Sequence, residues 1–131
     1  MYAKRYKAAG AETAGPGDLV VMLYDGILKF AAAALEALGE ADRPRLTLST
    51  NRAIAIVDYL QVILDSEQAP DLVAALDRTY THWIRSLARA SAEQDSAPIH
   101  AILPDIQGLR DAWAEAAKAV TRDQLMNRSL G

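Results

Sequence analysis

The feature that most constrains the fold is a helix start joined to an unusually apolar helix near the amino end. Gly15 and Pro16 suit the N-cap and the first helical position, because proline presets the helical φ and its missing N–H would be unpaired there anyway. The apolar residues that follow form two neighbouring helical faces: Val20, Leu23, Ile27 and Phe30 on one, and Val21, Tyr24, Leu28, Ala31 and Leu35 on the other. One core does not require both faces, so this helix has apolar surface to spare.

Turn signals divide the rest of the chain into further helical segments. The first helix is expected to run over 16–38 and to stop at Gly39, and the others over about 44–65, 70–91 and 95–120. The segments lack strand-length alternation, and their connections are short, which favours antiparallel neighbours. The sequence therefore predicts an all-α fold, an antiparallel up-down four-helix bundle.

The two ends and the fourth helix of this bundle carry further expectations. Residues 1–15 are predicted to form a flexible N-terminal segment, 16–120 the bundle, and 121–131 a frayed or mobile C-terminal tail. Pro104 interrupts the fourth helix, because it removes the hydrogen bond to the carbonyl of His100 and crowds that turn. The prediction is a kinked or broken helix that restarts at Asp105.

Core spacing is clear in the later helices. The third helix is expected to turn one face inward, formed by Leu72, Leu76, Tyr80, Trp83 and Leu87. The second helix carries a core stripe at heptad-like spacing, formed by Leu46, Ala53, Val57, Leu60 and Leu64. Beside it runs an adjacent and mostly apolar stripe, formed by Arg52, Ile56, Tyr59 and Ile63. This second stripe exceeds what a four-helix bundle buries on each helix.

Two interpretations of the surplus apolar surface remain open. Positions that flank the core of a short bundle are often half-buried against neighbouring helices, which needs no partner. Alternatively, the two stripes line a groove that receives an amphipathic or partly disordered segment of another protein.

Composition excludes several functional classes. A net charge of -3, with Lys4, Arg5 and Lys7 as the only basic cluster, argues against nucleic-acid binding. The absence of cysteine excludes disulfides and thiolate chemistry. No signal peptide and no apolar run of roughly 20 residues appear, so we expect a cytoplasmic protein without membrane insertion.

No catalytic constellation is found either. His82 and His100 are the only histidines, and neither follows a Glu by three residues as the ligand pairs of di-iron bundles do. We therefore expect no enzyme activity, no metal and no cofactor. In Tyr24-Asp25-Gly26, the glycine suits a close approach between helices, the aspartate should face solvent, and the tyrosine hydroxyl should be in water.

Several motifs resemble one family in collinear order. They are Met1-Tyr2-Ala3 with Tyr6, Glu12-Thr13-Ala14-Gly15-Pro16, Leu19-Val20-Val21-Met22-Leu23-Tyr24-Asp25-Gly26, Asn51-Arg52-Ala53-Ile54-Ala55-Ile56-Val57-Asp58, Leu64-Asp65, and Leu109-Arg110-Asp111-Ala112-Trp113. Over about residues 1–118 the chain resembles the FliS family of flagellin-specific export chaperones. It departs from the family pattern at Gly15, Ala69-Pro70, and Pro104 with Gly108.

The resemblance implies a helical bundle that binds the disordered C-terminal segment of flagellin in the cytoplasm. Binding would prevent premature polymerisation and aid delivery to the flagellar type III export gate. The resemblance and the stripes together give the candidate protein-binding residues Tyr6, Met22, Tyr24, Ile56, Tyr59 and Ile63. The alternative is a generic helical adaptor or a self-associating bundle, and a homodimer stays open, as do the flagellin bound, competition by regulators and the place of the N-terminal segment.

Overall fold

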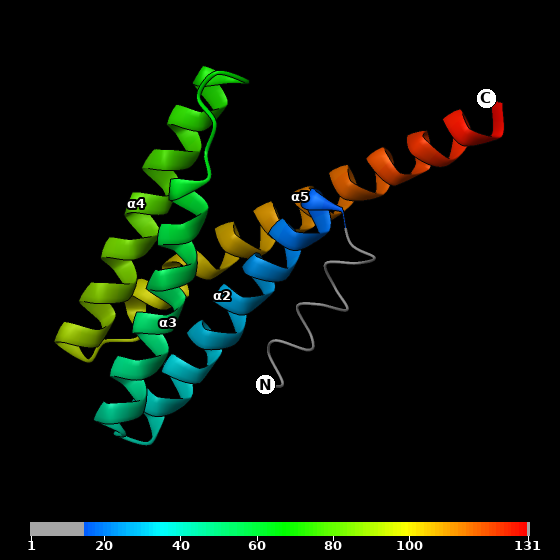
Figure 1. The fold of residues 1–131 in the computed structure, drawn as a ribbon. Helices are drawn as coiled ribbons and strands as arrows, with labels where there is room; N and C mark the ends of the chain where they lie inside the picture. The colour runs from blue at the N-terminus through cyan, green and yellow to red at the C-terminus, as the bar shows by residue number, and fades with distance from the viewer. Residues whose placement is uncertain (1–14, 131) are drawn as a thin grey trace.

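The fold is an antiparallel bundle of four helices, seen in a computed structural model that describes residues 15–130 (Figure 1). The helices are α2 (Pro16–Gly39), α3 (Arg43–Val62), α4 (Pro70–Glu93) and α5 (Ala97–Leu130). Packing follows a ring in which α2 lies against α3 and α5, and α4 lies against the same two helices from the other side. The described residues contain no strand, and the predicted all-α four-helix bundle is confirmed.

Local sequence explains where the helices begin and end. Asp18 in the first turn of α2 accepts a hydrogen bond from the N–H of Gly15 at 3.2 Å. At the start of α3, Asp42 accepts one from the N–H of Arg45 at 3.1 Å. Each contact satisfies or complements N–H groups that a helix start leaves without an internal partner. α4 ends at Gln94, whose left-handed φ of 52° turns the chain towards α5.

The core lies where the four helices meet. Its largest fully buried side chains include Trp83 and Tyr80 of α4, Tyr24 of α2, and Ile99 of α5. α2 contributes mainly small residues, since Ala31, Ala34 and Ala37 are all buried and allow the neighbouring helices to approach closely. Further along α2, Tyr24 packs against the aromatic rings of Tyr80 and Trp83 from α4.

One predicted core residue is not in the core. Leu72 is 53% exposed, whereas the other four members of the predicted α4 face are buried. Leu72 lies in the first turn of α4, and in Figure 1 this end of the α3–α4 pair projects beyond α2 and α5. The expectation was wrong because helical spacing shows which face turns inward but not how far the opposing helices reach.

α5 continues through Pro104 as one helix of 34 residues, so the predicted break with a restart at Asp105 does not occur. The alternative, a kink at Pro104, stays a prediction. Pro104 and His100 are both exposed, so this turn of α5 lies on the solvent side and not in the core. Residues 121–130 are helical and extend α5 beyond residue 120, the predicted end of the bundle, while a frayed or mobile end stays a prediction.

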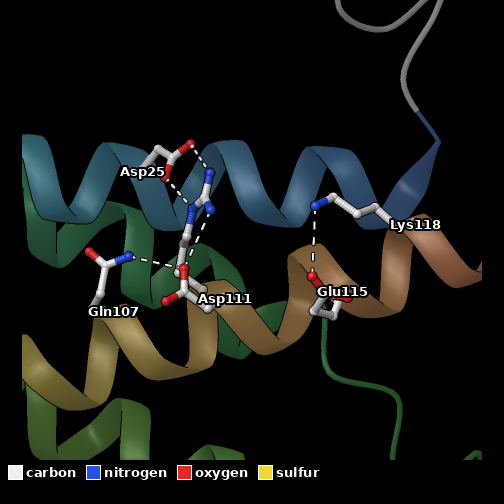
Figure 2. A network of polar contacts seen from close by, with 6 residues as sticks. Asp25, Gln107, Asp111, Glu115 and Lys118 are labelled. Atoms are coloured by element: carbon white, nitrogen blue, oxygen red, sulfur yellow. Dashed lines mark hydrogen bonds and ion pairs between the residues drawn. The ribbon is translucent and has the colours of Figure 1, made fainter.

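α5 is fastened to α2 by a polar network on the surface (Figure 2). The guanidinium of Arg110 contacts Asp25 through Nε at 2.8 Å, and also approaches Asp111 at 3.4 Å. Asp111 in turn accepts a hydrogen bond from the side chain of Gln107 at 3.1 Å. Asp25 is exposed to solvent, as expected, but it also forms the ion pair with Arg110 that links α2 to α5.

Arg110→Ala is expected to lower the free energy of unfolding only slightly, since the ion pair with Asp25 is partly exposed. Urea denaturation should show the loss at low salt and a smaller loss at high salt, because ions screen the pair. Lys118→Ala is the control, as its 3.7 Å contact with Glu115 is more exposed and lies within α5. Equal losses for both variants would contradict a role for Arg110 in joining the helices.

Candidate protein-binding site

The candidate site is an apolar surface along α2 and α3, which we call the outer face. It comprises Leu19, Met22 and Gly26 of α2, Ile56 and Tyr59 of α3, and Ile63, which directly follows α3. On each helix these residues are three or four positions apart and so share one side. Leu19 is 41%, Tyr59 54% and Ile63 46% exposed, while Met22 and Ile56 are half-buried.

Gly26 and Ile56 join the two helices within this face. A Cβ placed on Gly26 would lie 2.9 Å from Cδ1 of Ile56, so the isoleucine side chain occupies space that only glycine leaves free. This contact confirms the predicted close approach at Gly26. It also brings the exposed side chains of α2 and α3 into one continuous surface.

Positive charge gathers next to the outer face. Phe30 of α2 is half-buried, with the Lys29 ammonium 5.6 Å and the Arg52 guanidinium 5.7 Å from its ring centre. Such contacts are typical cation–π geometry. Arg52 belongs to the predicted second stripe of α3, and it adds a cation to an otherwise apolar surface.

Tyr24 does not belong to the outer face, which corrects the sequence prediction. Its side chain is fully buried, and its hydroxyl forms a 2.6 Å hydrogen bond with the hydroxyl of Tyr80. Its ring meets that of Trp83 edge to face at 5.9 Å. The prediction that this hydroxyl contacts water is wrong. The second apolar face of α2 turns towards α4 and α5, where the Tyr80 hydroxyl takes the place of water.

Burial also controls the ionisation of this tyrosine pair. Removal from water raises the pKa of Tyr24, against smaller opposing effects of the Tyr80 hydroxyl and the Trp113 indole. It also raises the pKa of Tyr80, and the neighbouring Tyr24 raises it further. Both phenols therefore remain protonated at neutral pH, as a shared hydrogen bond inside an apolar core requires.

The other predicted site residues, apart from Tyr6, lie together in the structure. Met22, Ile56, Tyr59 and Ile63 lie together on the outer face, whereas Tyr6 lies outside the described residues. The sequence prediction omitted Leu19 and Leu48, which are exposed on α2 and α3. Extending the second stripe of α3 by one turn towards the helix start would have found Leu48, whereas Leu19 belongs to neither of the two predicted faces of α2.

No helix within residues 15–130 combines the length and the apolar character needed to cross a bilayer. On the outer face, exposed apolar side chains lie along α2 and α3, which pack side by side.

Comparison with known proteins relates this chain to flagellar proteins. Residues 1–120 match the family model described as flagellar protein FliS. A protein of Bacillus subtilis named flagellar secretion chaperone FliS is 29% identical over 119 residues, covering 91% of this chain and 88% of the relative. Its namesake in Campylobacter jejuni is 34% identical over 107 residues, covering 82% of each chain. The Escherichia coli namesake is 28% identical over 125 residues, covering 88% of this chain and 92% of the relative.

Proposed function

The chain belongs to the FliS family of flagellar proteins, and from this membership we propose that it is a cytoplasmic chaperone for flagellin export. Its client is the disordered C-terminal segment of flagellin. By holding that segment, the chaperone prevents premature polymerisation and helps deliver flagellin to the flagellar type III export gate. Its role is binding rather than catalysis.

The exposed part of the outer face is the observation that carries this proposal. Tyr59 and Ile63 leave about half of their side-chain surfaces in water, beside the exposed Leu19. Burying such apolar surface contributes roughly 25 cal/mol per Å². A client segment that folds into an amphipathic helix could cover these residues with its own apolar side.

The charges beside the face suggest how the client is held. Lys29 and Arg52 stand next to Phe30, so acidic or carbonyl groups of the client would find partners at this place. We assign Met22, Ile56, Tyr59 and Ile63 to client contact and leave Tyr24 to the core. Tyr6 remains a candidate contact through its match to the family motif.

Folding of the client on the surface also explains how it can be released. A disordered segment loses conformational entropy when it becomes ordered, which offsets part of the favourable contact energy. The complex is therefore specific without being permanent. Export requires this, because the client must leave the chaperone at the gate.

Isothermal titration calorimetry with a peptide of the flagellin C-terminal segment tests the proposal. We expect 1:1 binding with a dissociation constant at or below tens of micromolar, about -6 to -7 kcal/mol or stronger. We also expect a negative heat-capacity change from apolar burial. A scrambled peptide of the same composition is the control. Absence of binding at these concentrations, or equal binding of the scrambled peptide, would refute the assignment.

A further inference from the structure

A second exposed surface lies at the end of the α3–α4 hairpin, and we call it the acidic tip. It comprises Val62 and Leu72, which are 73% and 53% exposed, together with the exposed carboxylates of Asp65, Glu67 and Asp71. Residues 53–77 contain five acidic residues and no Lys, Arg or His. None of the tip carboxylates forms an ion pair with another residue in the described range.

A surface of the opposite charge lies at the other projecting end of the molecule. Residues 118–130 of α5 follow Ala117, which packs against Gly17 with only 3.0 Å between its Cβ and an ideal Cβ at Gly17. Beyond that contact, Figure 1 shows α5 continuing alone past the start of α2. We call residues 118–130 the basic arm, which carries three basic residues and one acidic residue.

The basic arm also exposes large apolar side chains. Val120 is 55%, Leu125 57% and Met126 59% exposed. Arg122 and Arg128 lie among them and form no ion pair with any residue from 15 to 130. The arm therefore matches the acidic tip both in apolar character and in the sign of its charge.

We propose that the basic arm of one copy docks on the acidic tip of a second copy, forming a reciprocal dimer. The arm cannot reach the tip of its own chain, because α5 is a continuous helix and Figure 1 shows the two ends projecting in different directions. A twofold arrangement would use each arm and each tip once, so both contacts form together and no filament grows. This inference goes beyond client binding and does not depend on it.

The interface is small, because each of its two equivalent contacts joins only the end of one helix to the end of one hairpin. We therefore place it among weak, reversible interfaces. Because Val62 lies three residues after Tyr59 and directly before Ile63, a docked arm would also stand close to the outer face. Dimer formation would thus shield apolar surface when no client is present.

Analytical ultracentrifugation of the full chain provides the first measurement. From about 10 μM to 1 mM, the weight-average mass should rise from 14.2 kDa towards twice that value. Raising the salt concentration from about 0.05 to 0.5 M should weaken the association about tenfold, since the charges are exposed and screened. A chain that stays monomeric over this range would overturn the proposal.

Charge-reversal variants identify the surfaces. Asp65→Lys with Glu67→Lys changes the tip, and Arg122→Glu with Arg128→Glu changes the arm. Each double variant should lose most of its self-association, and an equimolar mixture of the two should recover a dimer that contains one copy of each. Both contacts of that mixed dimer again pair opposite charges.

Arg85→Glu with Arg89→Glu is the matched control, because both arginines are exposed on α4 away from the tip and the arm. This variant should associate like the unchanged chain. Circular dichroism checks that all variants keep their helices. If the variants still dimerise, if the control loses association equally, or if the mixture fails to recover the dimer, the arm and the tip do not form the interface.

Discussion

Trp83→Ala is expected to lower the free energy of unfolding by about 3–5 kcal/mol, measured by urea denaturation. Trp83 is fully buried, and its ring lies 5.4 Å from that of Tyr80 and 5.9 Å from that of Tyr24. Alanine would leave a cavity among rings held by α2 and α4, which cannot easily collapse. A domain of this size has about 5–15 kcal/mol of stability in total, so the loss is a large part of it.

Two further variants separate the causes of this loss. Trp83→Phe keeps much of the ring volume and removes a buried indole N–H that has no hydrogen-bond partner within residues 15–130. We therefore expect it to cost less than about half as much as alanine. His82→Ala changes the exposed neighbour and should have little effect. A loss below about 1 kcal/mol for Trp83→Ala would show that the aromatic cluster is not central to the core.

Tyr59→Asp combined with Ile63→Asp should weaken binding of the flagellin segment about 100-fold or more in calorimetry. Each replacement removes an exposed apolar side chain from the outer face and places a carboxylate that must lose water when the client docks. Such a loss corresponds to about 2.7 kcal/mol of binding free energy. Fold stability should change little, because both side chains are about half exposed.

Val120→Asp combined with Leu125→Asp is the control for this experiment. It adds the same charge at similarly exposed positions on α5, away from the outer face. We expect client affinity to stay within about threefold of the unchanged chain, because no proposed client contact is lost. If this control weakens binding as much as the outer-face variant does, the client contacts α5 and the proposed site is misplaced.

Most of the fold could be predicted because the residues that start each helix and those that face the core follow local sequence patterns. The N-cap and proline signals placed the starts of α2 and α4 at Pro16 and Pro70, and periodicity identified buried residues such as Trp83. The error at Leu72 has a physical origin. Its burial depends on how far neighbouring helices extend, and that length relationship is not written in the spacing of a single helix.

The candidate site was predicted less completely for a related reason. The sequence identified the two apolar stripes, and Tyr59 and Ile63 are indeed exposed. It could not show that Ile27 of one predicted α2 face and Tyr24 of the other are both fully buried, so Tyr24 was wrongly placed in the exposed site. The burial of Tyr24 depends on the large α4 residues that it meets, chiefly Tyr80 and Trp83.

The hydroxyl pair of Tyr24 and Tyr80 has a consequence for how the bundle is aligned. α2 and α4 lie diagonally across the ring of helices, each with α3 and α5 as its neighbours. Apolar side chains can slip past one another by a turn at modest cost, but a 2.6 Å bond between two hydroxyls permits only one vertical position. The hydroxyl pair therefore fixes the position of α2 relative to α4 along the axis of the bundle.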